Sequence, residues 1–150
     1  MKIRSDFVTN SSSSSFILGF KTSDEISEVR DLLPEYWSEN IKDEIISDIE
    51  RGITTKDEML KEYQKHIATW EWEFNGKTRW NMTREEVLSQ EYQKFIQDQK
   101  DKVSEDFVNE LHKYDIISIV EYEDHTRLGS ELEHDIMPYL DCTIKRLSHH

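Results

Sequence analysis

The sequence predicts an α+β (or α/β) domain, in which a small mixed sheet formed from both chain ends is covered by four to six helices from the middle. Three observations predict this class. Helix-start signals, Thr or Ser followed three residues later by Glu, recur through the middle of the chain. A helical segment separates the last two strands, which is typical of a parallel crossover. Short β-prone segments lie near residues 2–8, 16–20, 116–122 and 142–147.

The totals fit one soluble domain spanning 1–150. Apolar residues are only 35%, but 4 Trp, 6 Tyr and 6 Phe supply a large buried area for each residue. The one cysteine, Cys142, rules out an intrachain disulfide and a four-thiolate zinc site. No run approaches the ~18 apolar residues of a membrane span, and no secretory signal is visible. We therefore expect a cytoplasmic protein with no membrane contact.

The charge balance indicates the kind of partner. The chain has 19 Lys and Arg against 32 Asp and Glu, a formal net charge of −13. Such a surface repels phosphate backbones and anionic membranes, so direct nucleic-acid binding is not expected. It attracts basic proteins, including those whose positive grooves bind nucleic acid. Solubility alone is the other explanation of an acidic surface.

The N-terminal residues combine two β-prone pieces with a run of serines. Ile3–Val8 alternates in the pattern of an edge strand, and Phe16–Phe20 is apolar on both faces, as in an interior strand. Ser11–Ser15 is predicted to form a loop or turn between them. Such a loop presents hydroxyl and N–H groups to an anion, although the glycines of a phosphate-binding loop are missing.

This opening also carries a resemblance to known proteins. Arg4, Asp6-Phe-Val-Thr-Asn10, Ser11–Ser15 and Phe16 resemble the N-terminus of many small uncharacterised bacterial and phage-related proteins. That family has no settled activity. The resemblance therefore implies kinship with these bacterial and phage-related proteins, and it implies little about chemistry.

The first helices follow from their capping signals. Thr22 and Glu25 form a capping-box pattern at the start of one helix, which Pro34 ends. A second helix is predicted over 39–51. A third begins near Thr55-Lys-Asp-Glu58 and is expected to continue through the tryptophan-rich stretch to Asn75-Gly76. The alternative is a hairpin at Asn75-Gly76, the strongest two-residue turn signal.

The second half of the chain repeats these signals. Thr83-Arg-Glu-Glu86 is a further capping box, and its helix extends to about Tyr114, as one helix or as two with a restart at Ser104. The strand 116–122 should be the most buried. Ser130–Glu133 then begins a short helix before the last strand.

One candidate site lies in the acidic turn after the 116–122 strand. Asp124, His125 and Glu131 lie where open sheets place their sites, if this strand end is part of a parallel crossover. The spacings of known zinc sites are absent, so no metal and no cofactor are predicted. A solvated charged turn is the plain alternative.

A second candidate is an aromatic and acidic surface for protein binding. Trp72 and Trp80 are interleaved with charged residues, as in interface hot spots, and a helix that buries Trp70 and Phe74 would turn Trp72 outward. Core packing is the competing explanation. The predicted partner-binding residues are Trp72, Trp80, Glu85, Glu86, Glu91 and Asp98.

Three functional hypotheses follow. The first is an acidic, non-enzymatic protein that binds a basic partner stoichiometrically, in its sharpest form a phage-style inhibitor that mimics nucleic acid. The alternative is a small hydrolase or transferase whose site joins the Ser11–Ser15 loop to the acidic turn, with Ser13, Asp124, His125 and Glu131 as its catalytic residues. The third is a helical oligomerisation module, in which the long helix after Thr83 is the interface.

Overall fold

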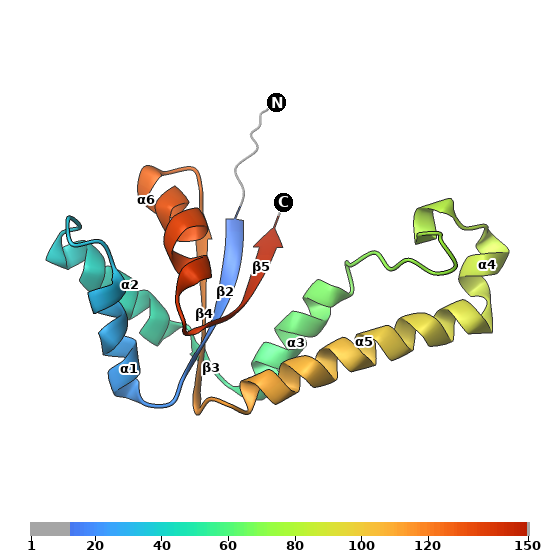
Figure 1. Cartoon of the computed structure of the whole chain (residues 1–150), viewed down its shortest axis with the longest axis horizontal. Helices are drawn as coiled ribbons and strands as arrows, with labels where there is room; N and C mark the ends of the chain where they lie inside the picture. Colours follow the sequence, from blue (N-terminus) through green and yellow to red (C-terminus); the bar gives the residue numbers. More distant parts are fainter. Residues whose placement is uncertain (1–12, 150) are drawn as a thin grey trace. The chain divides into compact units, whose positions relative to one another are not determined.

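The sheet of this α+β protein is formed from both ends of the chain, as predicted. A computed structural model describes residues 13–149, so the strand predicted near residues 2–8 lies outside the described part. The described sheet has four strands in the order β3-β4-β2-β5 (Figure 1). Their bounds are β2 (Ser13–Phe20), β3 (Ile53–Thr54), β4 (Ile116–Glu123) and β5 (Thr143–His149).

Strand β2 lies between the two long strands from the C-terminal part. It pairs antiparallel with β4 on one side and with β5 on the other, so β4 and β5 run in the same direction. The connection between them contains α6 (Arg127–Ser130), the π-helical segment η3 (Glu131–Ile136) and η4 (Met137–Tyr139). The predicted crossover therefore spans β2 instead of joining two neighbouring strands.

The serine run is not a loop where the structure describes it. Ser13–Ser15 begin β2, and the side chains of Ser14 and Ser15 are buried. Ser14 lies opposite Tyr122 of β4 and Ser148 of β5. Pairing on both sides satisfies the backbone groups of these serines, and this tertiary contribution outweighs their weak preference for strands. Ser11 and Ser12 lie outside the described residues.

One face of the sheet is covered by helices and carries a hydrophobic core. Phe16, Leu18 and Phe20 alternate on this face of β2. They pack with residues of α1 (Ser23–Glu28), η1 (Val29–Leu32), α2 (Glu39–Arg51) and η3. Figure 1 shows α1, α2 and α6 beside the strands.

The local signals for these helices were accurate to different degrees. Helix α2 has its predicted bounds, and the Ser38 hydroxyl accepts a hydrogen bond from the Ile41 N–H at 3.3 Å. The Thr22 side chain makes no cap hydrogen bond, and the Glu25 carboxylate accepts from the Lys21 N–H instead. The regular helix ends at Glu28, and Leu32, before Pro34, is 59% exposed.

The chain divides into two compact units, which we call the sheet unit and the helical unit. The sheet unit contains the chain up to Thr55 and from His112 onward, and the helical unit is Lys56–Leu111. In the helical unit, α3 (Lys56–Ile67) packs on α5 (Gln90–Leu111), with the rings of Tyr63 and Phe107 stacked at 4.1 Å between centroids. Two short elements, η2 (Arg79–Asn81) and α4 (Arg84–Leu88), precede α5.

Two predictions for the helical unit are wrong in detail. Helix α3 ends at Ile67 and does not reach Asn75-Gly76. Asn75 (φ 54°) and Gly76 (φ 77°) instead form a two-residue turn closed by pairing of Phe74 with Lys77. The long helix does restart, but at Ser89, whose hydroxyl accepts from the Tyr92 N–H at 3.2 Å, and α5 continues through Ser104.

The predicted capping box of α4 is present. The Thr83 hydroxyl accepts from the Glu86 N–H at 3.2 Å, and the Glu86 carboxylate accepts from the Thr83 N–H at 3.0 Å. These contacts and a hydrogen bond from Lys77 hold the pKa of Glu86 below its usual value. Within the described residues, no helix has both the length and the apolar character that crossing a membrane requires.

Candidate functional site

A polar cluster lies at the end of the sheet where β2 begins and β4 ends. Ser14 is fully buried on the helix-covered face of β2. Its hydroxyl donates to Glu133 Oε1 at 2.9 Å and accepts from Arg146 Nε at 3.0 Å. Residues from the beginning, the π-helical segment and the end of the described chain therefore meet at one point.

Glu133 is the buried centre of this cluster. Its side chain has no exposed surface, and Arg146 Nη2 lies 3.4 Å from Oε1. A carboxylate in the interior is tolerated only where hydrogen bonds and an opposite charge replace its hydration. Ser14 and Arg146 supply both on the Oε1 side, and they hold the carboxylate in one orientation.

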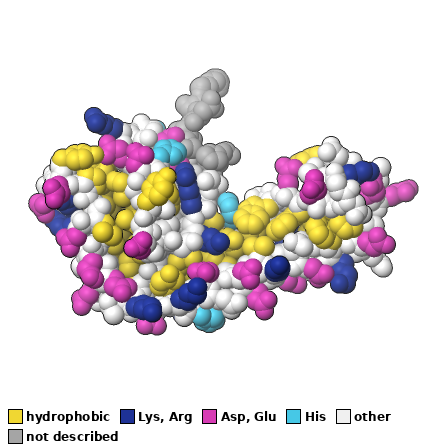
Figure 2. Space-filling view, in the orientation of Figure 1, with side chains coloured by type: hydrophobic (Ala, Val, Ile, Leu, Met, Phe, Trp, Pro, Cys, Tyr) yellow, Lys and Arg dark blue, Asp and Glu magenta, His cyan; other side chains and the backbone are white. Residues whose placement is uncertain are grey.

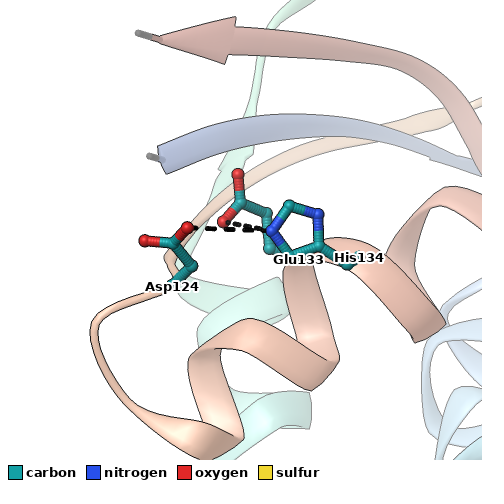
Figure 3. Close-up of side chains that lie close together, drawn as sticks. All are labelled: Asp124, Glu133 and His134. Carbon is teal, nitrogen blue, oxygen red and sulfur yellow. Dashed lines mark ion pairs between the residues drawn. The ribbon is translucent and has the colours of Figure 1, made fainter. Parts of the chain in front are cut away.

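His134 and Asp124 lie on the other side of Glu133 (Figure 3). His134 Nε2 is 3.5 Å from Glu133 Oε2 and 3.8 Å from Asp124 Oδ2. One possible ligand atom from each of these three residues lies within 4.8 Å of the others. Asp124 follows β4 directly, and η3 supplies Glu133 and His134.

A glycine shapes the turn that brings these elements together. Gly129 lies in α6, and a Cβ at this position would be 1.9 Å from the carbonyl oxygen of Glu123. The Thr126 hydroxyl caps α6 by accepting from the Gly129 N–H at 2.9 Å. The absence of a side chain at Gly129 lets α6 approach the end of β4, which positions Asp124 near η3.

A separate acidic pocket of about 310 Å³ lies between α2 and the end of β4. Its apolar lining includes Ile41, Ile45, Leu128 and Leu132. The residues that line it, all within the described part of the chain, include no Lys or Arg. The acidic residues along it are Glu44, Asp48, Glu121 and Glu123. Tyr122 directs its hydroxyl to Asp48 of α2, so strand alternation turns the side chains of Glu121 and Glu123 to the other face of the sheet, and Glu44 and Asp48 supply the carboxylates of the pocket.

Two of these acidic residues have defined local partners. Asp48 accepts a hydrogen bond from the Tyr122 hydroxyl at 3.2 Å and pairs with the Arg51 guanidinium. Burial, and next the charge of Asp48, raise the pKa of the Tyr122 phenol well above its usual range, so this hydroxyl stays a donor. Glu123 lies 2.8 Å from His125 Nδ1. Glu44 and Glu121 are exposed.

The catalytic residues of the enzyme hypothesis are not brought together as a set. Only Asp124 joins the polar cluster; Glu131 instead accepts from the Tyr36 hydroxyl at 2.9 Å and lies 3.4 Å from Arg127. His125 pairs with Glu123, as described above. Ser13 is on the opposite face of β2 from Ser14, because side chains alternate along a strand.

The predicted partner-binding residues all lie in the helical unit. Trp80 is 78% exposed, but Trp72 is largely buried, and its indole N–H is buried without a hydrogen-bond partner. The outward orientation predicted for Trp72 depended on a helix that is not formed there. Trp70 is 38% exposed and lies against Trp72, with 5.7 Å between ring centroids.

The four predicted acids of this surface are partly matched by bases. Glu86 is 3.1 Å from Lys77 Nζ, and Asp98 is 3.1 Å from Lys94 Nζ. Glu85 and Glu91 line a shallow pocket together with Glu86. Figure 2 shows Asp and Glu side chains with Lys and Arg between them on the drawn face of the molecule. The helical unit therefore presents mixed charge and exposed aromatic rings, not a continuous acidic surface.

Sequence reasoning missed Glu133 and Arg146 as site residues. Glu133 neighbours Leu132 in a segment predicted as an ordinary short helix, and its burial depends on the π-helical turn. Burial raises the pKa of the Cys142 thiol to about 11. A reactive thiol needs a lowered pKa, so the structure favours an inert cysteine.

Comparison with known proteins gave no match. No family model matches the chain, and no curated protein or solved structure was found to be similar to it. The N-terminal resemblance stays a prediction.

Proposed function

We propose that this protein binds a basic partner protein, and that the acidic pocket of the sheet unit receives a Lys or Arg side chain of that partner. The observation that carries the proposal is the pocket's combination of apolar walls with the carboxylates of Glu44 and Asp48. Lys and Arg have the matching shape, an apolar stem that ends in a cation. The proposed activity is stoichiometric binding without catalysis.

The size of the pocket supports one long side chain as its occupant. Its volume of about 310 Å³ is at the lower end of the range of about 300–1,000 Å³ found for small-ligand sites. Ile45 and Leu132 are buried and provide a fixed apolar floor. The stem of a lysine or arginine would contact this floor, and its charged end would face Glu44 and Asp48 of α2.

The net charge supports the same kind of partner. A formal charge of −13 accelerates the approach of a basic protein and repels acidic ones. A partner that itself binds nucleic acid has the required positive surface. In that case the bound acidic protein would compete with nucleic acid, which is the inhibitory form of the proposal.

The helical unit offers a second contact surface for the same partner. Trp80 is 78% exposed, and aromatic side chains of this kind are enriched where interfaces contribute most of their binding energy. Because Glu86 and Asp98 already pair with lysines, we assign the main role on this surface to Trp80. Trp72, Glu85 and Glu91 complete the proposed surface.

A titration with defined peptides tests the proposal. The probe is a fluorescent hexapeptide of alternating glycine and lysine, and its control is the same peptide with every lysine acetylated. Acetylation keeps the apolar stem and removes the charge. We expect binding of the lysine peptide only, and weaker binding when the salt is raised from low to physiological concentration, since exposed charges are screened.

Matched variants distinguish the pocket from the general charge of the chain. The double variant Glu44→Gln, Asp48→Asn should weaken binding about fivefold, since exposed ion pairs contribute about 0.5 kcal/mol each. The control removes two exposed acids from the helical unit, Glu62→Gln and Glu105→Gln. Equal weakening by both variants would show that only net charge matters and would refute the pocket.

The serine-nucleophile form of the enzyme hypothesis gains no support from the described geometry. Ser14 is fully buried, and its hydroxyl donates a hydrogen bond to Glu133. A catalytic serine instead needs access to substrate and a base that activates it. Ser13, the residue named by that hypothesis, lies opposite Glu123 in the sheet.

A further inference from the structure

We propose that Asp124, Glu133 and His134 bind one divalent transition-metal ion at the end of the sheet. The site is distinct from the acidic pocket, because none of the three residues lines that pocket. The proposal does not depend on the proposed function.

Two of the distances between the donor atoms are close to those of ligands around an ion. Zinc binds nitrogen and oxygen ligands at about 2.0–2.2 Å, which places neighbouring ligands of a tetrahedral site about 3.4 Å apart. His134 Nε2 is 3.5 Å from Glu133 Oε2 and 3.8 Å from Asp124 Oδ2. All three donor atoms lie within 4.8 Å of one another, so their contraction around an ion would bring them to bonding distance of a common centre.

A second histidine in the same region shows what a direct ion pair looks like in this molecule. His125 Nδ1 lies 2.8 Å from Glu123 Oε2, which is hydrogen-bond distance. His134 Nε2 approaches two carboxylates and is beyond that distance from both. The His134 arrangement therefore matches ligands around a shared ion better than a histidine–carboxylate hydrogen bond.

The Glu133 carboxylate is oriented in the way that metal-ligating carboxylates usually are. Ser14 donates to its Oε1 at 2.9 Å, and Arg146 Nη2 lies 3.4 Å from the same atom. Both contacts are on Oε1, and Oε2 is the oxygen closest to His134. Outer hydrogen bonds of this kind fix a ligand and are part of most metal sites. Full burial of Glu133 limits its movement further.

The ligand types indicate the class of metal. Imidazole suits zinc, iron, copper and nickel, whereas magnesium and calcium prefer sites made of oxygen atoms alone. One nitrogen and two carboxylates therefore favour Zn²⁺, Mn²⁺ or Fe²⁺ over Mg²⁺. Three protein ligands leave at least one position for water or another small ligand, as in open zinc sites.

Calorimetric titration of the chelator-treated full-length protein with ZnCl₂ tests the proposal, with MgCl₂ as the comparison. We expect one Zn²⁺ per chain and weaker binding of Mg²⁺. Asp124→Asn and His134→Gln should each weaken Zn²⁺ binding at least about tenfold, since even outer-shell changes at metal sites cost about 10–100-fold. Both side chains are partly exposed, so these variants should fold, and circular dichroism checks this.

The controls separate this site from other histidines and acids. Glu123→Gln and His125→Gln change the neighbouring ion pair and should leave Zn²⁺ affinity within twofold. The double variant His149→Gln, His150→Gln removes the last two histidines. It should also leave Zn²⁺ affinity within twofold of the wild-type value. The proposal is overturned if Asp124→Asn and His134→Gln bind Zn²⁺ as wild type does, or if only the C-terminal change abolishes binding.

Discussion

The sheet unit and the helical unit use charged residues in different ways. In the sheet unit, charged and hydroxyl groups enter the interior, where Ser14, Glu133 and Arg146 bond one another. In the helical unit, the interior is aromatic, as in the stacked rings of Tyr63 and Phe107, and ion pairs such as Lys94–Asp98 are exposed. Charge is therefore part of the packing in one unit and mainly part of the surface in the other.

This difference indicates where changes of charge should matter. Exposed ion pairs contribute little because water and salt screen them, while a buried carboxylate that loses its partners is costly. The sheet unit also contains both charged sites, the acidic pocket and the Asp124–Glu133–His134 cluster. The predictions below test the contrast, beginning with the largest effect.

The largest expected effect is the slow alkylation of Cys142 in the sheet unit. Burial raises the pKa of this thiol to about 11. At pH 8 about one thousandth of it would be thiolate, against about a quarter for an ordinary thiol with a pKa of ~8.5. Iodoacetamide should therefore react more than about 100-fold more slowly with the native chain than with the chain in urea.

The alkylation rate of Cys142 and the stability of the native chain should both change with pH in a defined direction. The native rate should rise about tenfold for each pH unit until the pH approaches 11, because the thiolate is the reacting species. Over the same range the unfolded chain releases the thiol proton first, so rising pH above ~8.5 favours unfolding. Equal rates for native and unfolded chains at pH 8 would show that this part of the sheet unit is open to solvent.

Arg146→Met is the sharpest test of the contrast in charge. Removing the guanidinium leaves the fully buried Glu133 without its cation, and breaking a buried pair costs about 3–5 kcal/mol. Arg146 is 33% exposed, so we expect about 3 kcal/mol or less in the free energy of unfolding. Urea denaturation measures this value.

Lys94→Met is the matched control in the helical unit. It removes the cation of the exposed pair with Asp98, and it should cost about 0.5 kcal/mol or less. Similar losses for the two variants would contradict the distinction between the units.

Ser14→Ala should cost about 2 kcal/mol. The hydroxyl bonds both Glu133 and Arg146, and a buried polar group that loses its partner costs about 1–3 kcal/mol. Ser13→Ala, one residue earlier and on the opposite face of β2, serves as the control. Thermal or urea unfolding compares the two, and a larger loss for Ser13→Ala would contradict the assigned network.

A smaller effect than that of Ser14→Ala is expected for Thr83→Ala in the helical unit. Thr83 caps α4 by accepting from the Glu86 N–H, and loss of such a cap costs about 1 kcal/mol. Thr83→Ser keeps the hydroxyl and should cost less than half as much. If both variants were equally destabilised, the capping hydrogen bond would not be the cause.

Local signals predicted the elements whose stability is local. Helix α2 is bounded as expected, with Gly52 following its last residue, and the Thr83 box begins α4. The participation of both chain ends in the sheet was also predictable, because Phe16–Phe20 and 116–122 are apolar enough to require burial. These features depend on residues close together in the sequence or on composition.

The polar cluster could not be predicted in the same way. Five serines in a row favour a loop by composition, and only Glu133 and Arg146, more than a hundred residues later, make a strand position for Ser14 favourable. Asp124 was a candidate, but the close approach of Glu133 and His134 to it depends on the π-helical turn. A regular helix directs adjacent residues away from each other, so their meeting was not visible.

The acidic pocket was missed for a related reason. Glu44 and Asp48 belong to α2, and Glu121 and Glu123 belong to β4, more than seventy residues away. In the sequence, each pair has the spacing of two acidic residues on a solvent-exposed face of its own helix or strand. Only the packing of α2 beside the end of β4 places the carboxylates of Glu44 and Asp48 beside Tyr122 and one apolar floor.

The most direct test of the central claim is to map the binding of the glycine–lysine hexapeptide by NMR on the ¹⁵N-labelled protein. The account predicts that the largest amide shifts fall on pocket residues such as Ile45, Tyr122 and Gly129, and that the acetylated peptide does not cause them. The largest shifts falling within Lys56–Leu111, or equal shifts with the acetylated peptide, would contradict the claim that the acidic pocket receives a basic side chain.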